Sequence, residues 1–150
     1  MIIENILEST VKQIIFHIES MVPQYMEIPE DRQKANGNVA VCIIEGDGTV
    51  HGKIFGENKI KGRDIFRVAW LKASQVWITG YQTGEYEQLI FTNQLQEDEN
   101  GIRKPDMIGW EGGQPIYLKD GTMLSIGFSG FRGQTDLEIV KRAVEAAQTI

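Results

Sequence analysis

The sequence predicts an α+β domain, in which helices pack on a mostly antiparallel sheet. Asp-Gly pairs at 47–48 and 120–121 each separate two short runs of strand-forming residues, which is the pattern of a β-hairpin. Three longer segments repeat apolar residues at intervals of three and four, the period of an amphipathic helix. Hairpins pair strands antiparallel, so the sheet is predicted to be mostly antiparallel. Along the chain, the predicted order of elements is helix, hairpin, helix, hairpin, helix.

The first predicted helix covers residues 4–22, where apolar residues form a single stripe. Pro23 and Pro29 are expected to end this helix and to begin a polar connection over residues 30–38. The β-branched run at residues 39–44 then predicts a buried strand, and the run after the first Asp-Gly pair predicts its hairpin partner. The apolar stripe of the helix consists of Leu7, Val11, Ile14, Ile15, Ile18 and Val22.

The middle of the chain predicts a loop over residues 56–62, followed by a helix over residues 64–79. Gly80 is a suitable residue for the C-cap of this helix. Ala69 and Ala73 lie one turn apart on its apolar face. Because both side chains are small, we expect this helix to pack close to the sheet.

Residues 85–92 fit either a short helix or a strand, and residues 96–106 are polar and acidic enough to predict a solvated loop. The second hairpin is predicted from residues 114–118 and 122–128, the latter alternating between apolar and small or polar side chains. A glycine-rich turn follows. The pattern Thr135-x-x-Glu138 is that of a capping box, and it predicts the start of a last helix.

Composition favours one domain over residues 1–150 and excludes several kinds of partner. A net charge of -6 argues against nucleic acid or an anionic membrane as the default partner. No apolar stretch is long enough to span a bilayer, and the N-terminus lacks a leader pattern, so we expect a soluble cytoplasmic protein. With one Cys and two His, and no EF-hand spacing among its acidic residues, the chain predicts no metal site built from side chains.

The glycine-rich turn at residues 127–133 is the first candidate for ligand binding. It lies between a predicted strand and a predicted helix, where backbone N–H groups at the helix N-terminus can face an anion. The same sequence also fits an ordinary tight turn. Lys72 is a cation on the middle helix that could bind a carboxylate together with this turn, or that could extend along the helix surface toward solvent.

His17 is the second candidate, because it lies at the border of the apolar stripe of the first helix. A neutral imidazole is a good axial ligand for haem iron, although a boundary histidine with a polar partner is the alternative. Trp70 and Trp77 share a face of the middle helix, which favours a core or subunit contact over a cofactor cage.

Three blocks of sequence follow one another in a recognisable order. They are Val41-x-Ile-Ile-Glu45-Gly-Asp-Gly48; Ala69-Trp-Leu-Lys72-Ala73 with the later Thr83; and Gly112-Gly-Gln-Pro115-Ile with Ser125-Ile-Gly-Phe-Ser129-Gly130 and Asp136. From about residue 39 to the C-terminus, the sequence in this way resembles the GlcG/HbpS family, the haem-degrading-type domain also found at the C-terminal end of PduO-type proteins.

The resemblance implies an antiparallel sheet of about five strands with helices on both faces, a homo-oligomer and, for some members, haem binding. Of the residues in these blocks, Lys72, Thr83, Ser129 and Gly130 are candidate cofactor-binding residues, together with His17. Two departures suggest a divergent member: Glu45 where the family commonly has Asp, and Phe55 where it commonly has Arg.

Together these observations predict a protein that binds a small ligand, with haem or a related tetrapyrrole as the leading ligand and His17 as its axial donor. One alternative is a non-catalytic assembly protein whose tryptophans and sheet edges form subunit contacts. The other is a sensor or enzyme for a small carboxylated metabolite held by Lys72 and the turn at 129–133. The sequence supports no assignment of a reaction.

Overall fold

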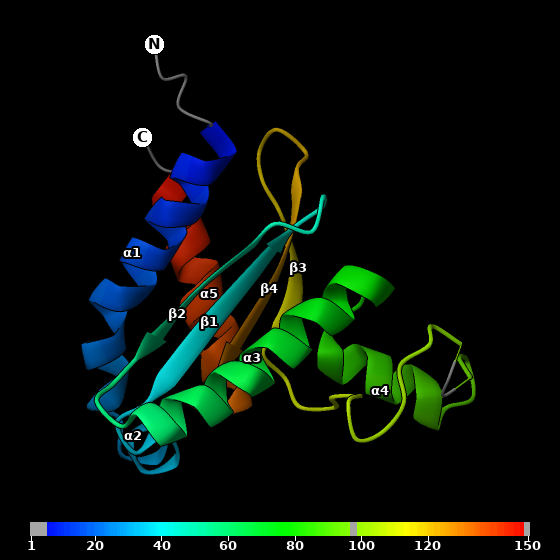
Figure 1. Cartoon of the computed structure of the whole chain (residues 1–150), viewed down its shortest axis with the longest axis horizontal. Coiled ribbons are helices and arrows are strands. Elements are labelled where there is room, and N and C mark those ends of the chain that lie inside the picture. Colours follow the sequence, from blue (N-terminus) through cyan, green and yellow to red (C-terminus); the bar gives the residue numbers. More distant parts are fainter. Residues whose placement is uncertain (1–5, 97–98, 149–150) are drawn as a thin grey trace.

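The computed structural model describes residues 6–96 and 99–148, which form a four-stranded antiparallel sheet and five helices (Figure 1). The α+β class is therefore confirmed, with four strands in place of about five. The sheet has the order β2-β1-β4-β3. Its strands are β1 (Val39–Glu45), β2 (Val50–Phe55), β3 (Gly113–Tyr117) and β4 (Met123–Ser129), and the helices are α1 (Ile6–Met26), α2 (Pro29–Ala35), α3 (Lys59–Thr79), α4 (Thr83–Phe91) and α5 (Gly133–Gln148).

Strand pairing is antiparallel throughout. β1 pairs with β2 and with β4, and β3 pairs with β4. Gly48 and Gly121, the glycines of the two Asp-Gly pairs, have φ values of 90° and 88°, which favour glycine over residues with a side chain. The order of elements also includes α2 and α4, which the predicted order lacks.

The prediction that Pro23 ends the first helix is wrong, because Pro23 lies inside α1. An interior proline costs a helix about 3 kcal/mol. Val22 and Tyr25, on either side of Pro23, are buried, and Tyr25 contacts Arg142 of α5 and Phe131 of the preceding loop. Each buried apolar side chain contributes about 1.5–3 kcal/mol. Packing thus offsets the local penalty. Pro29 starts α2 where a polar connection was predicted, because proline is favoured in the first turn of a helix.

The middle helix also begins earlier than predicted. Asn58 is its N-cap, and the Asn58 side chain accepts a hydrogen bond from the Lys61 N–H. Gly62 lies inside the first turns because Ile54 of β2 packs directly over it; a Cβ at Gly62 would lie 2.6 Å from Ile54 Cγ2. Gly80 caps the other end as predicted, with φ 77° and its N–H bonded to the Val76 carbonyl.

The two faces of the sheet carry different helices. α1 and α5 cover the face where the odd-numbered residues of β1 and the large side chains of β4 point, and they enclose the main core. α3 crosses the other face, in contact with Ala40, Cys42 and Ile44 through its own Ala69 and Ala73 (Figure 1). This close approach confirms the expectation drawn from the two alanines. Burial raises the pKa of the Cys42 thiol to about 12.

The segment that the sequence left open, residues 85–92, is largely helical and belongs to α4. Figure 1 shows α4 and the following loop extending away from the sheet. Residues 96 and 99–106 form no helix or strand, in agreement with the predicted loop; residues 97 and 98, like residues 4 and 5 of the first predicted helix, lie outside the described residues. Among the described residues, no helix is both long enough and apolar enough to cross a membrane.

Candidate functional site

The end of α2, the first half of α3 and the turn before α5 converge at one end of the sheet (Figure 1). A cleft of about 450 Å³ lies between them. Its cations are Lys34 from α2 and Lys61 and Lys72 from α3, and Glu111 supplies a carboxylate. Apolar side chains from α3 and from the loop before β3 also line it: Ile65, Val68 and Trp110.

Lys34 and Lys61 differ from Lys72 in their exposure. Lys34 is exposed and Lys61 is half-buried, and neither forms an ion pair with another described residue. Lys72 is 3% exposed. Its Nζ donates a hydrogen bond to the Phe128 carbonyl at 2.9 Å and lies 3.4 Å from Asp136 Oδ2. The cleft therefore has two free cations near solvent and one paired cation at its buried end.

Glycines make room for the buried amine. Gly112 has φ 123°, and a Cβ there would lie 2.6 Å from Lys72 Nζ. At Gly127 a Cβ would lie 2.9 Å from Lys72 Cβ and 2.2 Å from the Ala69 carbonyl oxygen. The G-G-x-P and I-G-x-S-G blocks of the sequence thus place their glycines around Lys72.

Burial and pairing act in opposite directions on this ion pair. Burial lowers the pKa of Lys72 and raises the pKa of Asp136, because both groups lose hydration when charged. The opposite charge of the partner counteracts each shift. Asp136 Oδ1 also accepts a hydrogen bond from the Phe131 N–H.

The glycine-rich turn offers fewer anion-binding groups than its sequence suggests. The Phe131 N–H bonds Asp136, and the Arg132 N–H bonds Asp31, so neither is free for a ligand. Ser129 and Gly130 do line the cleft, and the Ser129 hydroxyl makes no hydrogen bond to the described part of the chain. The turn therefore presents the Ser129 hydroxyl to a ligand.

Asp31 was not found by sequence reasoning, although it is fully buried beside the cleft. Its carboxylate accepts hydrogen bonds from the Arg132 N–H and guanidinium and from the Thr135 hydroxyl. Burial opposes ionisation of Asp31, but these hydrogen bonds outweigh burial and hold its pKa below the usual value. The same contact explains why the predicted capping box is wrong: Thr135 lies inside α5, and its hydroxyl serves Asp31.

Thr83 supports the cleft from behind. It is fully buried at the start of α4, and its hydroxyl donates to the Trp110 carbonyl and accepts from the Gly113 N–H. It is not among the residues that line the cleft. Its hydrogen bonds instead fix the loop that carries Trp110, whose side chain is 68% exposed.

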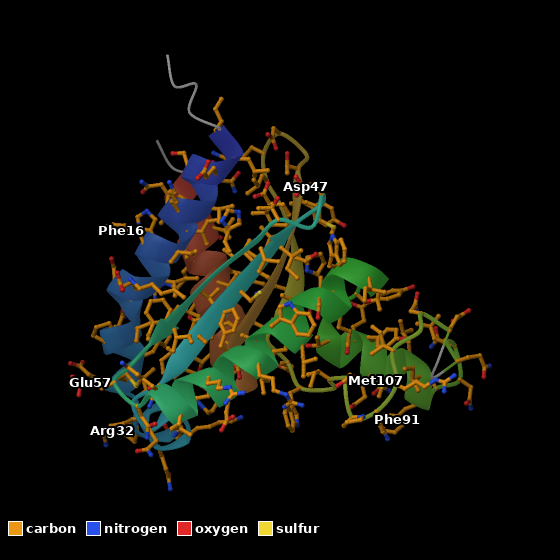
Figure 2. The ribbon with its side chains drawn as sticks, viewed as in Figure 1. Phe16, Arg32, Asp47, Glu57, Phe91 and Met107 are labelled. Atoms are coloured by element: carbon orange, nitrogen blue, oxygen red, sulfur yellow. The ribbon has the colours of Figure 1, made fainter. Side chains whose placement is uncertain are left out.

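His17 lies on the other side of the sheet, in α1, and does not line this cleft. The structure thus brings together Lys72, Ser129 and Gly130, with Thr83 next to them, and leaves His17 apart. The His17 ring packs edge-on against Phe16, with ring centroids 5.5 Å apart, and its nitrogens make no hydrogen bond to the described residues. Figure 2 places Phe16 on the outer side of α1, and 59% of this side chain is exposed.

Side chains that bind metals do not gather in the described part of the chain: no three of its His, Cys, Asp and Glu residues lie close enough to hold an ion. The tryptophans predicted to make core or subunit contacts, Trp70 and Trp77, are 44% and 42% exposed, so neither belongs to the core. Lys34, Lys61 and Trp110 were missed because each is an unremarkable surface residue in sequence, and only the fold brings them to one cleft.

No protein-family model matches the sequence, and no curated protein does. Solved structures do match over the whole chain. Protein ORFY of Klebsiella pneumoniae, described as DUF336, is 15% identical with a TM-score of 0.69, covering 100% of this chain and 95% of that one. HbpS is 18% identical with a TM-score of 0.56, covering 100% and 94%. The PduOC:heme complex is 13% identical with a TM-score of 0.60, covering 97% and 95%.

The chain has the GlcG/HbpS-like fold. The resemblance inferred from three sequence blocks is confirmed at this level, since HbpS and PduOC share the architecture over nearly their whole lengths. At these identities the likeness establishes the fold alone, and function has to be argued from the residues of this chain.

Proposed function

We propose that the protein binds a small organic anion with a flat apolar part in the cleft between α2, α3 and the turn before α5. The observation that carries this proposal is the pair of unpaired lysines, Lys34 and Lys61, which line the same cleft as the exposed Trp110. Two cations without partners repel each other and gain most from a bound anion. Ile65 and Val68 supply apolar surface for the rest of the ligand.

The size and charge of the cleft suit this class of ligand. Small-molecule sites commonly enclose about 300–1,000 Å³ and combine apolar walls with a few polar groups, and this cleft of about 450 Å³ does the same. The opposite charges of Lys72 and Asp136 largely cancel at its buried end. We therefore expect the anionic group of the ligand to bind near the solvent, at Lys34 and Lys61.

A matched pair of probes tests the proposal. Benzene-1,4-dicarboxylate should raise the melting temperature and bind in calorimetry, whereas its neutral diamide should not. The double variant Lys34→Gln/Lys61→Gln should weaken dicarboxylate binding about tenfold, or about 1.4 kcal/mol.

The control variant is Lys12→Gln/Lys141→Gln, which removes the same charge from exposed helix positions outside the cleft. Equal losses in the two double variants would show a general charge effect and contradict the proposal. So would the absence of binding by any dicarboxylate of this size.

A second candidate is haem or a related tetrapyrrole on the outer face of α1. The free imidazole of His17 next to the exposed Phe16 ring favours it, and the fold is that of the PduOC protein solved as a heme complex. The donor set fits, since haem iron takes one neutral imidazole and the macrocycle packs on apolar side chains. The protein would supply an axial ligand and an aromatic surface, and haem when bound would supply redox or ligand-sensing chemistry.

Hemin titration followed in the Soret region tests this candidate. His17→Ala should abolish the shift of the Soret band, and Phe16→Ala should weaken binding. His51→Ala is the matched control, because His51 is engaged by Glu45 at the far end of the sheet. A shift that survives in His17→Ala would exclude the α1 site.

Self-association as a homo-oligomer remains a prediction. β2 is an edge strand, and its Val50 and Ile54 are 50% and 44% exposed. An unpaired, partly apolar edge favours contact with another chain. Light scattering should then give a mass above that of one chain, and Ile54→Lys should lower it; a monomer at high concentration would contradict the prediction.

A further inference from the structure

Lys72 is not needed for the ligand binding proposed above, because Lys34 and Lys61 can supply the charge. It is nevertheless the buried group at the inner end of the same cleft. A fully charged lysine is costly to bury, and a role in packing alone would be met by an apolar side chain of similar length.

The amine is held in a defined place. Nζ donates to the Phe128 carbonyl at 2.9 Å and faces Asp136 Oδ2 at 3.4 Å. These two acceptors can take up both N–H groups of the neutral amine, which leaves its lone pair without a hydrogen-bond partner among them. Gly112 lets the backbone pass close to the amine, since a Cβ there would lie 2.6 Å from Nζ, and Nζ belongs to a residue that lines the cleft.

Burial shifts the protonation equilibrium of Lys72 toward the neutral amine, which is the nucleophilic form. Burial lowers the pKa of Lys72, and this is a common way in which proteins activate a lysine toward carbonyl groups. Asp136, held by the Phe131 N–H, stands next to Nζ as a group that can accept a proton and return it. An amine, a proton carrier and a cleft thus occur together.

We propose that Lys72 is an imine-forming lysine, whose Nζ condenses with the aldehyde or ketone group of an anionic ligand held in this cleft. The inference rests on the proposed function, since the ligand would be placed by Lys34 and Lys61 near the cleft mouth. It assigns the ligand to the class of carbonyl compounds that also carry a carboxylate or another anionic group.

The reaction needs no oxidant, reductant or cofactor. The lone pair of Nζ forms a bond to the carbonyl carbon, and one of the two Nζ protons passes by way of Asp136 to the carbonyl oxygen, which gives a carbinolamine. Asp136 then accepts the second proton from nitrogen and delivers it to the carbinolamine hydroxyl. This hydroxyl leaves as water, and the products are an imine at Nζ and one molecule of water.

Reductive trapping in the unmodified protein tests the inference without a variant that could fail to fold. The probe is 4-formylbenzoate, an aromatic aldehyde with one carboxylate, used at neutral pH with borohydride and followed by peptide mapping. Lys72 should be labelled faster than exposed Lys141, because a lowered pKa raises the neutral fraction of an amine at neutral pH.

Two controls sharpen the result. Benzaldehyde, which lacks the carboxylate, should label Lys72 much more slowly than 4-formylbenzoate does. In Lys34→Gln/Lys61→Gln, labelling of Lys72 by 4-formylbenzoate should fall about tenfold, while labelling of Lys141 should stay the same.

The outcomes separate this inference from the proposed function. If 4-formylbenzoate stabilises the protein against heat but Lys72 is not labelled, the imine is excluded and anion binding stands. If the probe neither binds nor labels Lys72, both are overturned. Labelling spread evenly over the exposed lysines also overturns the inference.

Discussion

The face of the sheet under α1 and α5 buries large apolar side chains, whereas the face under α3 buries small residues and polar groups. On the first face Phe128, Ile126 and Leu124 of β4 are fully buried. On the second face β4 presents Gly127 and Ser125, and α3 contributes Ala69 and Ala73 together with buried Lys72 and Gln75. Adjacent residues of one strand thus serve two different kinds of packing.

The α1 and α5 face contributes most to folding stability, whereas the α3 face forms the candidate site. Large side chains on the α1 and α5 face remove the most apolar surface from water and dominate the free energy of folding. On the α3 face glycine and alanine bring the helix backbone close to the sheet, so that a lysine from the helix can reach a carboxylate beyond the sheet. Small side chains on the α3 face therefore leave the room in which Lys72 and Asp136 meet at the end of the cleft.

Two buried carboxylates show the same contrast. Asp31 accepts hydrogen bonds from Arg132 and Thr135, and its pKa is lowered despite burial. Asp136 has the Phe131 N–H and an amine at 3.4 Å, and burial raises its pKa. Asp31 is therefore a structural anion, and Asp136 is the one suited to exchange a proton.

The largest expected effect tests the face under α1 and α5. Phe128→Ala should lower the free energy of unfolding by about 3–5 kcal/mol, because it removes a fully buried ring and leaves a cavity. Urea denaturation followed by circular dichroism measures the change. Phe16→Ala is the control, and its loss should stay below about 0.5 kcal/mol because the ring is exposed.

Asp31→Asn should lower stability by about 1.5–3 kcal/mol at pH 7, since it removes the charge from a network of hydrogen bonds. The pKa of Asp31 is lower in the folded state, so its contribution is present above the unfolded pKa and is lost as the pH falls through the folded value. The gap between wild type and variant should therefore shrink between pH 5 and pH 3. Glu30→Gln, one residue earlier and exposed, should show no such gap.

Gly127→Ala probes the α3 face by adding one methyl group. Because this Cβ would lie 2.2 Å from the Ala69 carbonyl oxygen, α3 would have to move, at a cost of about 1–3 kcal/mol. Gly46→Ala is a matched control in a turn where a Cβ meets nothing within 4 Å. Equal melting temperatures for the two variants would show that close packing of α3 is not required.

Thr83→Val has the smallest expected effect and tests the hydrogen bonds that hold the Trp110 loop at the wall of the cleft. The loss of the hydroxyl should cost about 1 kcal/mol, the net value of a buried hydrogen bond, and should loosen the loop that carries Trp110. Tryptophan fluorescence and dicarboxylate affinity would report the loosening. Thr92→Val, at the exposed end of α4, should change neither.

Much of the fold could be predicted because its signals are local. The turns at Gly48 and Gly121, the alternation along β4 and the helical period of α1, α3 and α5 all act within a few residues. The errors arose where tertiary contacts override local preference. Pro23 remains helical because the next turn packs against α5, and Thr135 bonds Asp31, which lies about a hundred residues earlier in the chain.

The sequence predicted residues of the site only where they lie in the three blocks that resemble the family. Lys72, Ser129 and Gly130 came from those blocks and do gather at one cleft. Lys34 and Lys61 carry no such mark, because a surface lysine in sequence is indistinguishable from one that lines a cleft. Asp31 was missed for a related reason: a carboxylate in a polar segment gives no sign that a distant arginine will bury it.

The buried thiol of Cys42 can report on the movement of α3 away from the sheet. Its thiol lies in the central strand, under α3, and a thiol with a pKa of about 12 is almost wholly protonated and inert at neutral pH. A disulfide reagent can react only in molecules where α3 has briefly lifted from the sheet, so the rate of thiol modification reports how often that helix opens. A ligand that binds both α3 and the turn before α5 would lower the rate at which the Cys42 thiol is modified.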